Sequence, residues 1–206
     1  MSREIKPGSR AHEKQLAILD SAMHEFLTHG YSAASMDRIS ERAGVSKATV
    51  YSHFRDKEKL YEALIESKIE VACQVDMSKL AAPGTLSLQE HIKELSEIWI
   101  CPLEEPESEP FMQFMRMTIA ESGRFPQLAR TFVERVEKPV NIELRRYLQS
   151  CGIKKADAET IAWIIAGTYC YHVVINRMMS GGDIMPMDRD RLTAMLGAMI
   201  AAYSNK

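Results

Sequence analysis

Residues 44–60 read GVSKATVYSHFRDKEKL, and this stretch decides the fold. Gly44 stands where the chain must turn sharply between two short helices, and a positive φ is cheap there only for glycine. Ser46 is a favourable N-cap for a helix over residues 47–54, and Asp56 is one for the helix that follows. The stretch therefore predicts a turn and two helices, with the first of them kept short.

The residues before this stretch supply its partner helix. Residues 35–43 read SMDRISERA, in which Ser35 caps a short helix that ends at Gly44. The small apolar core expected between the two helices consists of Ile39, Ala43, Val45, Val50 and Phe54. Further upstream, apolar residues recur at helical spacing over 13–29 and Gly30 closes that helix, after an arm of residues 1–12.

This arrangement predicts a helix-turn-helix, with its second helix in the major groove of DNA. Lys47 and Thr49 lie early in the second helix, so we expect them at base edges. Lys57 starts the next helix and adds a cation beside free backbone N–H groups. The residues expected to contact phosphates are Ser35, Tyr51, His53 and Lys57.

The run over 44–60 closely resembles the TetR family of bacterial regulators, which share the turn glycine, a Tyr-x-His/Tyr-Phe block and an Asn/Asp/Ser-Lys step before a leucine. The resemblance covers about residues 11–71, which we take as the DNA-binding domain. It implies a homodimeric regulator, usually a repressor, that binds a palindromic operator and is released by a small molecule. It also implies that base specificity lies chiefly with Lys47, Ala48, Thr49 and Ser52.

Residues 72–206 are expected to form a helical-bundle domain for effector binding and dimerisation, which makes the fold all-α. Within it, 114–129 (FMRMTIAESGRFPQLA) resembles the AefR-type C-terminal domain. Residues 81–84 break the chain, and a helix runs from Thr85 or Ser87 to about Trp99. Three prolines and four glutamates over 102–110 predict an acidic, solvated loop. A helix starting at Gln127 should break near Pro139. The last helices span about 155–179 and 188–203.

Methionine accounts for 13 residues, many of them beside aromatic residues, which favours an adaptable apolar pocket for a small apolar or amphipathic effector. For any single one of these residues an ordinary core position is the favoured explanation, while a pocket is still expected somewhere among these helices. The expected lining set is Trp99, Phe114, Met115, Trp163, Tyr169 and His172. His172 is either a polar anchor in that pocket or a histidine with internal hydrogen bonds.

Small residues on the last two helices indicate a dimer contact, because they let helices approach closely. On the first of these helices they are Ala162, Ala166, Gly167 and Cys170, and on the second Ala194, Gly197, Ala198, Ala201 and Ala202. Packing within one chain accounts for only one side of each helix, although both are apolar nearly all round.

Composition limits the other classes of function. Residues 1–60 carry 10 Lys+Arg and 8 Asp+Glu, while the whole chain has a net charge of −2, so only the N-terminal end is basic. The four cysteines are far apart, which favours reduced thiols in a cytoplasmic protein over disulfides or zinc. No secretory signal, membrane span or cofactor is expected.

An all-α enzyme is the main alternative function, but the sequence has no phosphate loop, no HExxH and no Glu-x-x-His pair. Candidate nucleophiles such as Ser122 lack a recognisable base partner. A regulator controlled by a protein partner, or by oxidation of Cys101 or Cys151, stays open. So does activation in place of repression.

Overall fold

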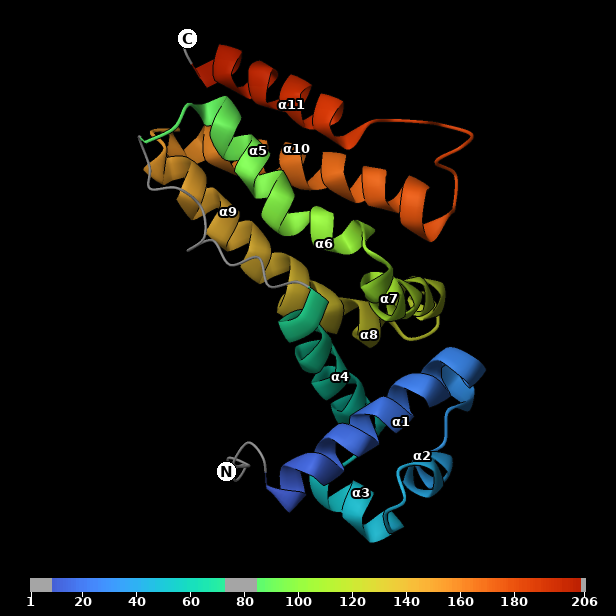
Figure 1. Ribbon diagram of the computed structural model, residues 1–206. Coiled ribbons are helices and arrows are strands. Elements are labelled where there is room, and N and C mark those ends of the chain that lie inside the picture. Colours follow the sequence, from blue (N-terminus) through green and yellow to red (C-terminus); the bar gives the residue numbers. More distant parts are fainter. Residues whose placement is uncertain (1–8, 73–84, 205–206) are drawn as a thin grey trace. The chain divides into compact units, whose positions relative to one another are not determined.

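Helices and the turns between them account for residues 9–72 and 85–204, the part of the chain that the computed structural model describes (Figure 1). No strand occurs within these two ranges. The all-α prediction is therefore confirmed. The predicted break at 81–84 lies outside the described residues.

Packing divides the chain into two compact units. Unit 1 comprises Met1–Lys68 with Gln113–Phe132, and unit 2 comprises Ile69–Met112 with Val133–Lys206. The helix α7, Glu109–Glu121, begins in unit 2 and ends in unit 1. The functional division predicted between residues 71 and 72 is a separate matter and stays a prediction.

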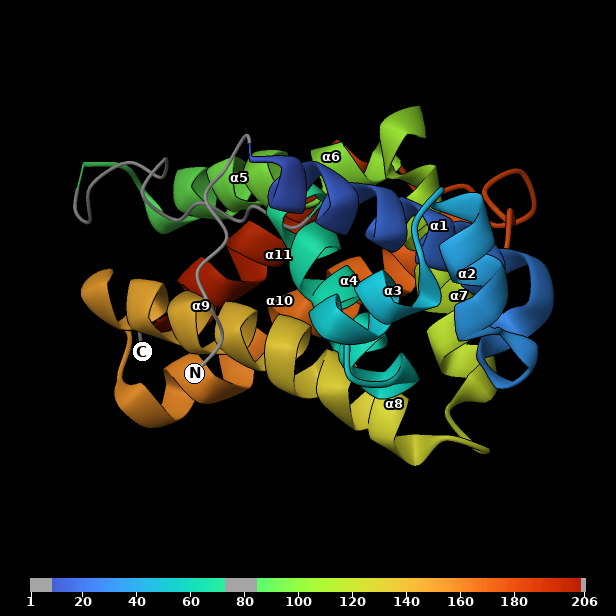
Figure 2. The same cartoon turned by 90° about the horizontal axis from the view of Figure 1, so that it is seen from below.

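Unit 1 contains four N-terminal helices, which we call the head. They are α1 (Arg10–Ala33), α2 (Met36–Arg42), α3 (Lys47–His53) and α4 (Lys57–Ala72). The end of α7 and all of α8, Pro126–Phe132, complete the unit. Seen from below, α2 and α3 lie on the near side of the head (Figure 2).

The start of α1 corrects the predicted arm of residues 1–12. The helix already begins at Arg10, because the Ser9 side chain accepts a hydrogen bond from the N–H of His12 at 3.2 Å. At its other end, Gly30 has φ 74° and ψ 164°, so regular α-helix ends there as predicted and one more turn follows to Ala33.

Unit 2 is a set of packed helices (Figure 1). They are α5 (Leu88–Trp99), α6 (Cys101–Glu104), the start of α7, α9 (Lys138–Ser150), α10 (Lys155–Val173) and α11 (Arg189–Ser204). Helix α11 packs along α5, and α9 packs along α10. A Cβ on Gly197 would stand 3.2 Å from the Cα of Gln89, so α11 and α5 approach closely at this glycine.

The predicted acidic loop over 102–110 is wrong. It is replaced by α6, a 3₁₀ turn over Pro106–Ser108 and the first turn of α7. Pro102 and Pro106 stand within the first two positions of their helices, where a missing N–H costs nothing. Leu103 and Ser108 are buried, and the Glu104 carboxylate lies within bonding distance of His172 and Arg189 of unit 2. Buried contacts and ion pairs therefore hold a segment that composition alone describes as solvated.

The predicted break near Pro139 takes the form of a change in helix type. A π-helical turn over Val133–Glu137 joins α8 to α9, and Pro139 follows in the first turn of α9. Because proline has no N–H to donate to the preceding turn, the regular α-helical hydrogen bonds cannot run through this point.

Helix α10 with the π-helical turn Val174–Met178 is long and apolar enough to cross a membrane by length and composition alone. Its residues Ile161, Ala162, Ile165 and Tyr169 are buried among the helices of unit 2. Packing within this unit accounts for that side of the helix.

Candidate nucleic-acid interface

The turn between α2 and α3 is fixed by local hydrogen bonds. The N–H of Val45 donates to the carbonyl of Ser40 at 3.1 Å, and the N–H of Gly44 donates to that of Glu41 at 3.2 Å. Together they form a Schellman motif, which satisfies the last carbonyls of α2. Gly44 has φ 66°, the left-handed conformation that the sequence predicted for it. The angle at which α3 leaves the turn is therefore set by residues within one short stretch.

Helix α3 has one buried and one exposed side. The Ser46 side chain accepts the N–H of Thr49 at 3.1 Å and caps the helix. Val50 and Phe54 are buried beside Ile39 of α2 and hold α3 against the rest of the head. The solvent-exposed residues of α3 are Lys47, Ala48, Tyr51 and Ser52. A short helix with one buried and one exposed side has the form that enters a major groove.

Three predicted contacts have partners within the head. The Lys47 ammonium lies 2.6 Å from a carboxylate oxygen of Asp37, and this bond raises its pKa. Thr49 is half-buried and its hydroxyl bonds that of Ser46 at 2.8 Å. His53 is half-buried against the Phe54 ring. An exposed ion pair is worth about 0–1 kcal/mol, so Lys47 can leave Asp37 for DNA at little cost.

Lys57 is held differently from what its position in the sequence suggests. Its ammonium donates to the carbonyls of Tyr31, Ser32 and Ala34, at 2.6, 3.1 and 3.2 Å. It also stands 4.6 Å from the centre of the Tyr31 ring. Burial lowers the pKa of this ammonium, partly offset by nearby carboxylates. The side chain therefore binds carbonyl groups at the end of α1, and its predicted phosphate contact stays a prediction.

Glu25 organises the entry to α2, and sequence reasoning missed it. It is 5% exposed, and its carboxylate accepts the N–H of Ser35 at 3.0 Å and Nε of Arg38 at 2.7 Å. Burial raises the pKa of Glu25, but these hydrogen bonds and the charge of Arg38 outweigh burial and lower it. Ser35 in turn caps α2 by accepting the N–H of Asp37 at 3.2 Å. A glutamate on the apolar side of α1 was the only signal in the sequence.

An aromatic cluster joins the head to α7 and to the turn that precedes α8, within unit 1. Tyr31, Tyr61, Phe114 and Phe125 stack or meet edge to face, with ring centres 5.1–5.8 Å apart. The Tyr61 hydroxyl bonds that of Thr118 at 2.7 Å in a buried position, and burial raises the pKa of Tyr61 to about 12. The head and α7 therefore share one core.

Two family models match two separate parts of the chain. Residues 18–64 match the model of bacterial regulatory proteins of the tetR family, which covers α1 to α4. Residues 103–154 match the AefR-like transcriptional repressor C-terminal domain. The chain belongs to the TetR family. Members of this family are DNA-binding transcriptional regulators.

Curated relatives of this TetR-family protein match it over short stretches. It is 41% identical over 58 residues to the transcriptional activator FasR of Mycolicibacterium smegmatis, a match covering 28% of this chain and 26% of the relative. It is 37% identical over 60 residues to the repressor AcnR of Corynebacterium efficiens, covering 29% and 32%. The matches thus span about a quarter to a third of these relatives' length, and they include both an activator and a repressor.

Solved structures match the TetR-family fold over nearly the whole chain. A TetR-family regulator from Mesorhizobium loti has a TM-score of 0.71 at 24% identity, covering 95% of this chain and 96% of that one. Salmonella enterica GusR has a TM-score of 0.68 at 20% identity, covering 98% and 100%. The flavonoid-responsive regulator FrrA has a TM-score of 0.69 at 24% identity, covering 92% and 95%. At these identities the likeness establishes the fold.

The residues predicted to line an effector pocket are divided between the two units of this TetR-family chain. Phe114 and Met115 belong to unit 1, where Phe114 is fully buried in the aromatic cluster. In unit 2, Trp99 meets Tyr169 edge to face at 6.1 Å, and Tyr169 is fully buried. Trp163 is 70% exposed, and of the set only His172 lines a cavity described below. The lining set stays a prediction.

Proposed function

We propose that this protein is a ligand-responsive transcriptional regulator, in the first instance a repressor, that binds a palindromic operator as a homodimer. One observation carries the proposal: α3 is fixed by its cap and by Val50 and Phe54, while Lys47, Ala48, Tyr51 and Ser52 face solvent. Lys47 and Ser52 reach base edges, Ala48 allows close approach, and the Tyr51 hydroxyl donates to phosphate. DNA binding places the protein in the cytoplasm.

The dimer forms through the outward faces of α10 and α11. Large apolar side chains are exposed there: Trp163 at 70%, Ile164 at 48%, Met195 at 61% and Met199 at 64%. Monomeric proteins rarely leave such a surface in water. Of the small residues predicted for this contact, Ala162 and Gly197 are buried within unit 2, so the interface uses the remaining ones. Two-fold symmetry would then set two copies of α3 about 34–36 Å apart for successive major grooves.

A small apolar or amphipathic effector, rather than thiol oxidation, controls DNA binding in this proposal. Burial raises the pKa of the Cys101 thiol, despite the nearby charge of Arg189, and burial likewise raises that of Cys151. A thiol with a raised pKa holds little of the reactive thiolate. An effector acts by favouring a dimer with a different separation of the two heads, which requires unequal affinity for the two states.

The test uses fluorescence anisotropy on DNA from upstream of the protein's own gene, with random competitor DNA at two salt concentrations. Lys47→Ala is compared with Lys59→Ala, because each lysine is exposed and lies 2.6 Å from a carboxylate, Asp37 and Glu62 respectively. We expect Lys47→Ala to weaken operator binding by about tenfold or more and to reduce selectivity. Lys59→Ala should change binding by less than about threefold.

Equal losses in both variants would show that α3 does not read bases. If the wild-type protein prefers neither this DNA nor any sequence in a genome-wide binding selection, the regulator function is rejected. Spin labels on the two heads test the release step. Saturating effector that leaves the distance between heads unchanged contradicts the route proposed here.

A further inference from the structure

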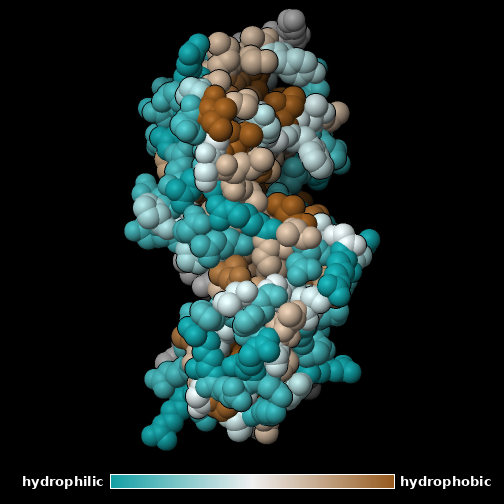
Figure 3. Space-filling view, turned by 90° about the vertical axis from the view of Figure 1, so that its right-hand side faces the viewer, coloured by the Kyte–Doolittle hydropathy of each residue, from teal (hydrophilic) through white to brown (hydrophobic). Residues whose placement is uncertain are grey.

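A cavity of about 520 Å³ lies within unit 2, at the end of α10. Its walls include Thr168 and His172 of α10, Ile175 of the π-helical turn, Met185 and Met187 of the following loop, and Leu192 of α11. Tyr171, Ile184 and both methionines are about half or more exposed around it. Figure 3 faces this side and shows hydrophobic side chains gathered on unit 2. A volume of this size suits a small organic molecule.

The backbone shapes this cavity. The N–H of Met179 donates to the carbonyl of Val174 at 2.9 Å, a π-type bond that widens the end of α10. The loop then returns so closely that a Cβ on Gly181 would stand 3.3 Å from the Ile175 carbonyl oxygen. On Gly182 it would stand 2.5 Å from the side-chain oxygen of Asn176. The two glycines let the loop fold over the π-helical turn and hold the cavity wall in place.

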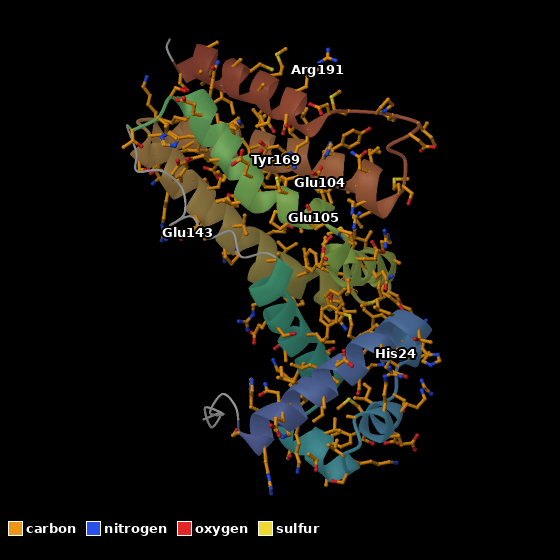
Figure 4. The ribbon with its side chains drawn as sticks, viewed as in Figure 1. His24, Glu104, Glu105, Glu143, Tyr169 and Arg191 are labelled. Atoms are coloured by element: carbon orange, nitrogen blue, oxygen red, sulfur yellow. The ribbon has the colours of Figure 1, made fainter. Side chains whose placement is uncertain are left out.

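The polar side chains His172 and Asn176 of the cavity wall already have hydrogen-bond partners within the protein. His172 is 6% exposed; its Nδ1 faces the Asn176 amide at 3.2 Å, and its Nε2 lies 2.9 Å from Glu104. Asn176 also donates to the His172 carbonyl at 2.8 Å. Glu104 has a second partner, Arg189, at 2.7 Å. Figure 4 labels Glu104 on α6 and Tyr169 on α10, neighbouring helices of unit 2. The histidine is thus oriented without help from a ligand.

None of the residues lining the cavity is Lys, Arg, Asp or Glu. A charged ligand would gain no countercharge from these side chains for any hydration that it loses there, which is unfavourable. An apolar ligand meets flexible methionines and aliphatic side chains that adapt to its shape. A hydroxyl, carbonyl or N–H on such a ligand meets Thr168, Asn176 or Tyr171 at the wall.

We propose that this cavity is a binding site for a neutral, mainly apolar small molecule that carries one or a few hydrogen-bonding groups. This proposal names the site and the chemical class of the effector in the proposed function. Only the effect of the ligand on DNA binding rests on that function. The binding step is tested without DNA.

The probe is N-phenyl-1-naphthylamine, a neutral aromatic amine whose fluorescence rises in apolar surroundings. Its sulfonated analogue 1-anilinonaphthalene-8-sulfonate has the same rings and one negative charge, so the pair isolates the effect of charge. Titration of the full-length protein should give saturable binding of the neutral probe at one site per chain. The anionic analogue should bind at least about tenfold more weakly, because its charge is unpaired in the cavity.

Thr168→Phe fills the cavity, and Thr160→Phe makes the same substitution at an exposed position of α10 outside it. We expect Thr168→Phe to weaken binding of the neutral probe at least about tenfold and Thr160→Phe to change it less than about twofold. Circular dichroism melts check that both variants fold. Met187→Ala, which removes apolar wall without adding bulk, should weaken binding too.

Equal affinity for both probes, or unchanged affinity in both Thr168→Phe and Met187→Ala, overturns the proposal. A third pair of results also overturns it: the wild type binds no probe, and Thr168→Phe changes the protein from dimer to monomer in sedimentation. The cavity would then be part of an interface between two copies of the chain. Probe binding without any effect on operator affinity keeps the site but separates it from regulation. Operator binding without probe binding rejects the site alone.

Discussion

The helix-turn-helix and unit 2 differ in what fixes their helices and in what their outer surfaces display. Over residues 35–54, each helix is set by a serine cap and one glycine turn within a few residues. In unit 2, α6, α10 and α11 are joined by Glu104, whose partners His172 and Arg189 are 68 and 85 residues away. The exposed side of α3 is polar, whereas those of α10 and α11 carry tryptophan, isoleucine and methionine.

This contrast separates two kinds of surface. A polar helix face is stable in water and can exchange water for phosphates and base edges. An apolar helix face gains free energy only when another apolar surface covers it. The partners proposed for the two surfaces therefore differ, DNA for α3 and a second copy of the chain for α10 with α11, and substitutions test each proposal separately.

The largest effect is expected from Met199→Glu on the outward face of α11, where the residue is 64% exposed. Each copy of the dimer then buries an unpaired carboxylate, which should weaken dimerisation by at least about 3 kcal/mol. Leu16→Glu is the matched change in the head, at 50% exposure. Analytical ultracentrifugation should show a monomer for Met199→Glu and a dimer for Leu16→Glu. A dimer in both cases would place the interface elsewhere.

A smaller effect is expected from Glu25→Gln, which removes the charge that holds Ser35 and Arg38 at the entry to α2. Loss of hydrogen bonds to a buried charged group should lower the free energy of unfolding by about 2 kcal/mol. The control is Glu143→Gln on α9, because Glu143 forms an exposed pair with Arg146. Urea unfolding at pH 7, followed by circular dichroism, measures the free energy of unfolding of both variants. Equal losses of stability would contradict the role of Glu25 at the entry to α2.

The same variant tests a pH dependence. The pKa of Glu25 lies below its ordinary value of 4.5, so the folded protein binds a proton less readily than the unfolded chain. Its stabilisation is therefore fully present above that value and is lost as the pH falls through the folded pKa. The stability gap between wild type and Glu25→Gln should be constant near neutral pH and shrink below about pH 4.5. A stability difference between the two proteins that does not change at low pH would show that the Glu25 carboxylate is not its cause.

The smallest effect is expected at the turn glycine. Gly44→Ala meets no atom within 4 Å but forces alanine to φ 66°, which should cost about 1–2 kcal/mol. Gly123→Ala also enters open space without a positive φ, so it should be neutral or slightly stabilising. Thermal melts compare the two. If both variants melt like the wild type, backbone conformation at Gly44 does not limit the stability of the helix-turn-helix.

Much of the head could be predicted because its signals are local. Ser35, Ser46 and Gly44 act on backbone groups two to five residues away, so reading the sequence in order locates their helices. The cap at Asp56 was predicted in the same way, and Ser87 is the correct one of the two starts predicted for α5. The loop expected over 102–110 failed because composition cannot show that Leu103 and Ser108 are buried or that Glu104 has two partners.

By itself, the sequence determined the helical class, the caps and turn glycine of the helix-turn-helix, and the resemblance to the TetR family. Only the tertiary structure showed that the Glu25 carboxylate accepts hydrogen bonds from Ser35 and Arg38, and that the Lys57 ammonium donates to carbonyls at the end of α1. The cavity at the end of α10 likewise became visible only in the tertiary structure. The reason is distance along the chain: caps and turns act between near neighbours, whereas buried polar pairs and cavities need residues that only folding brings together.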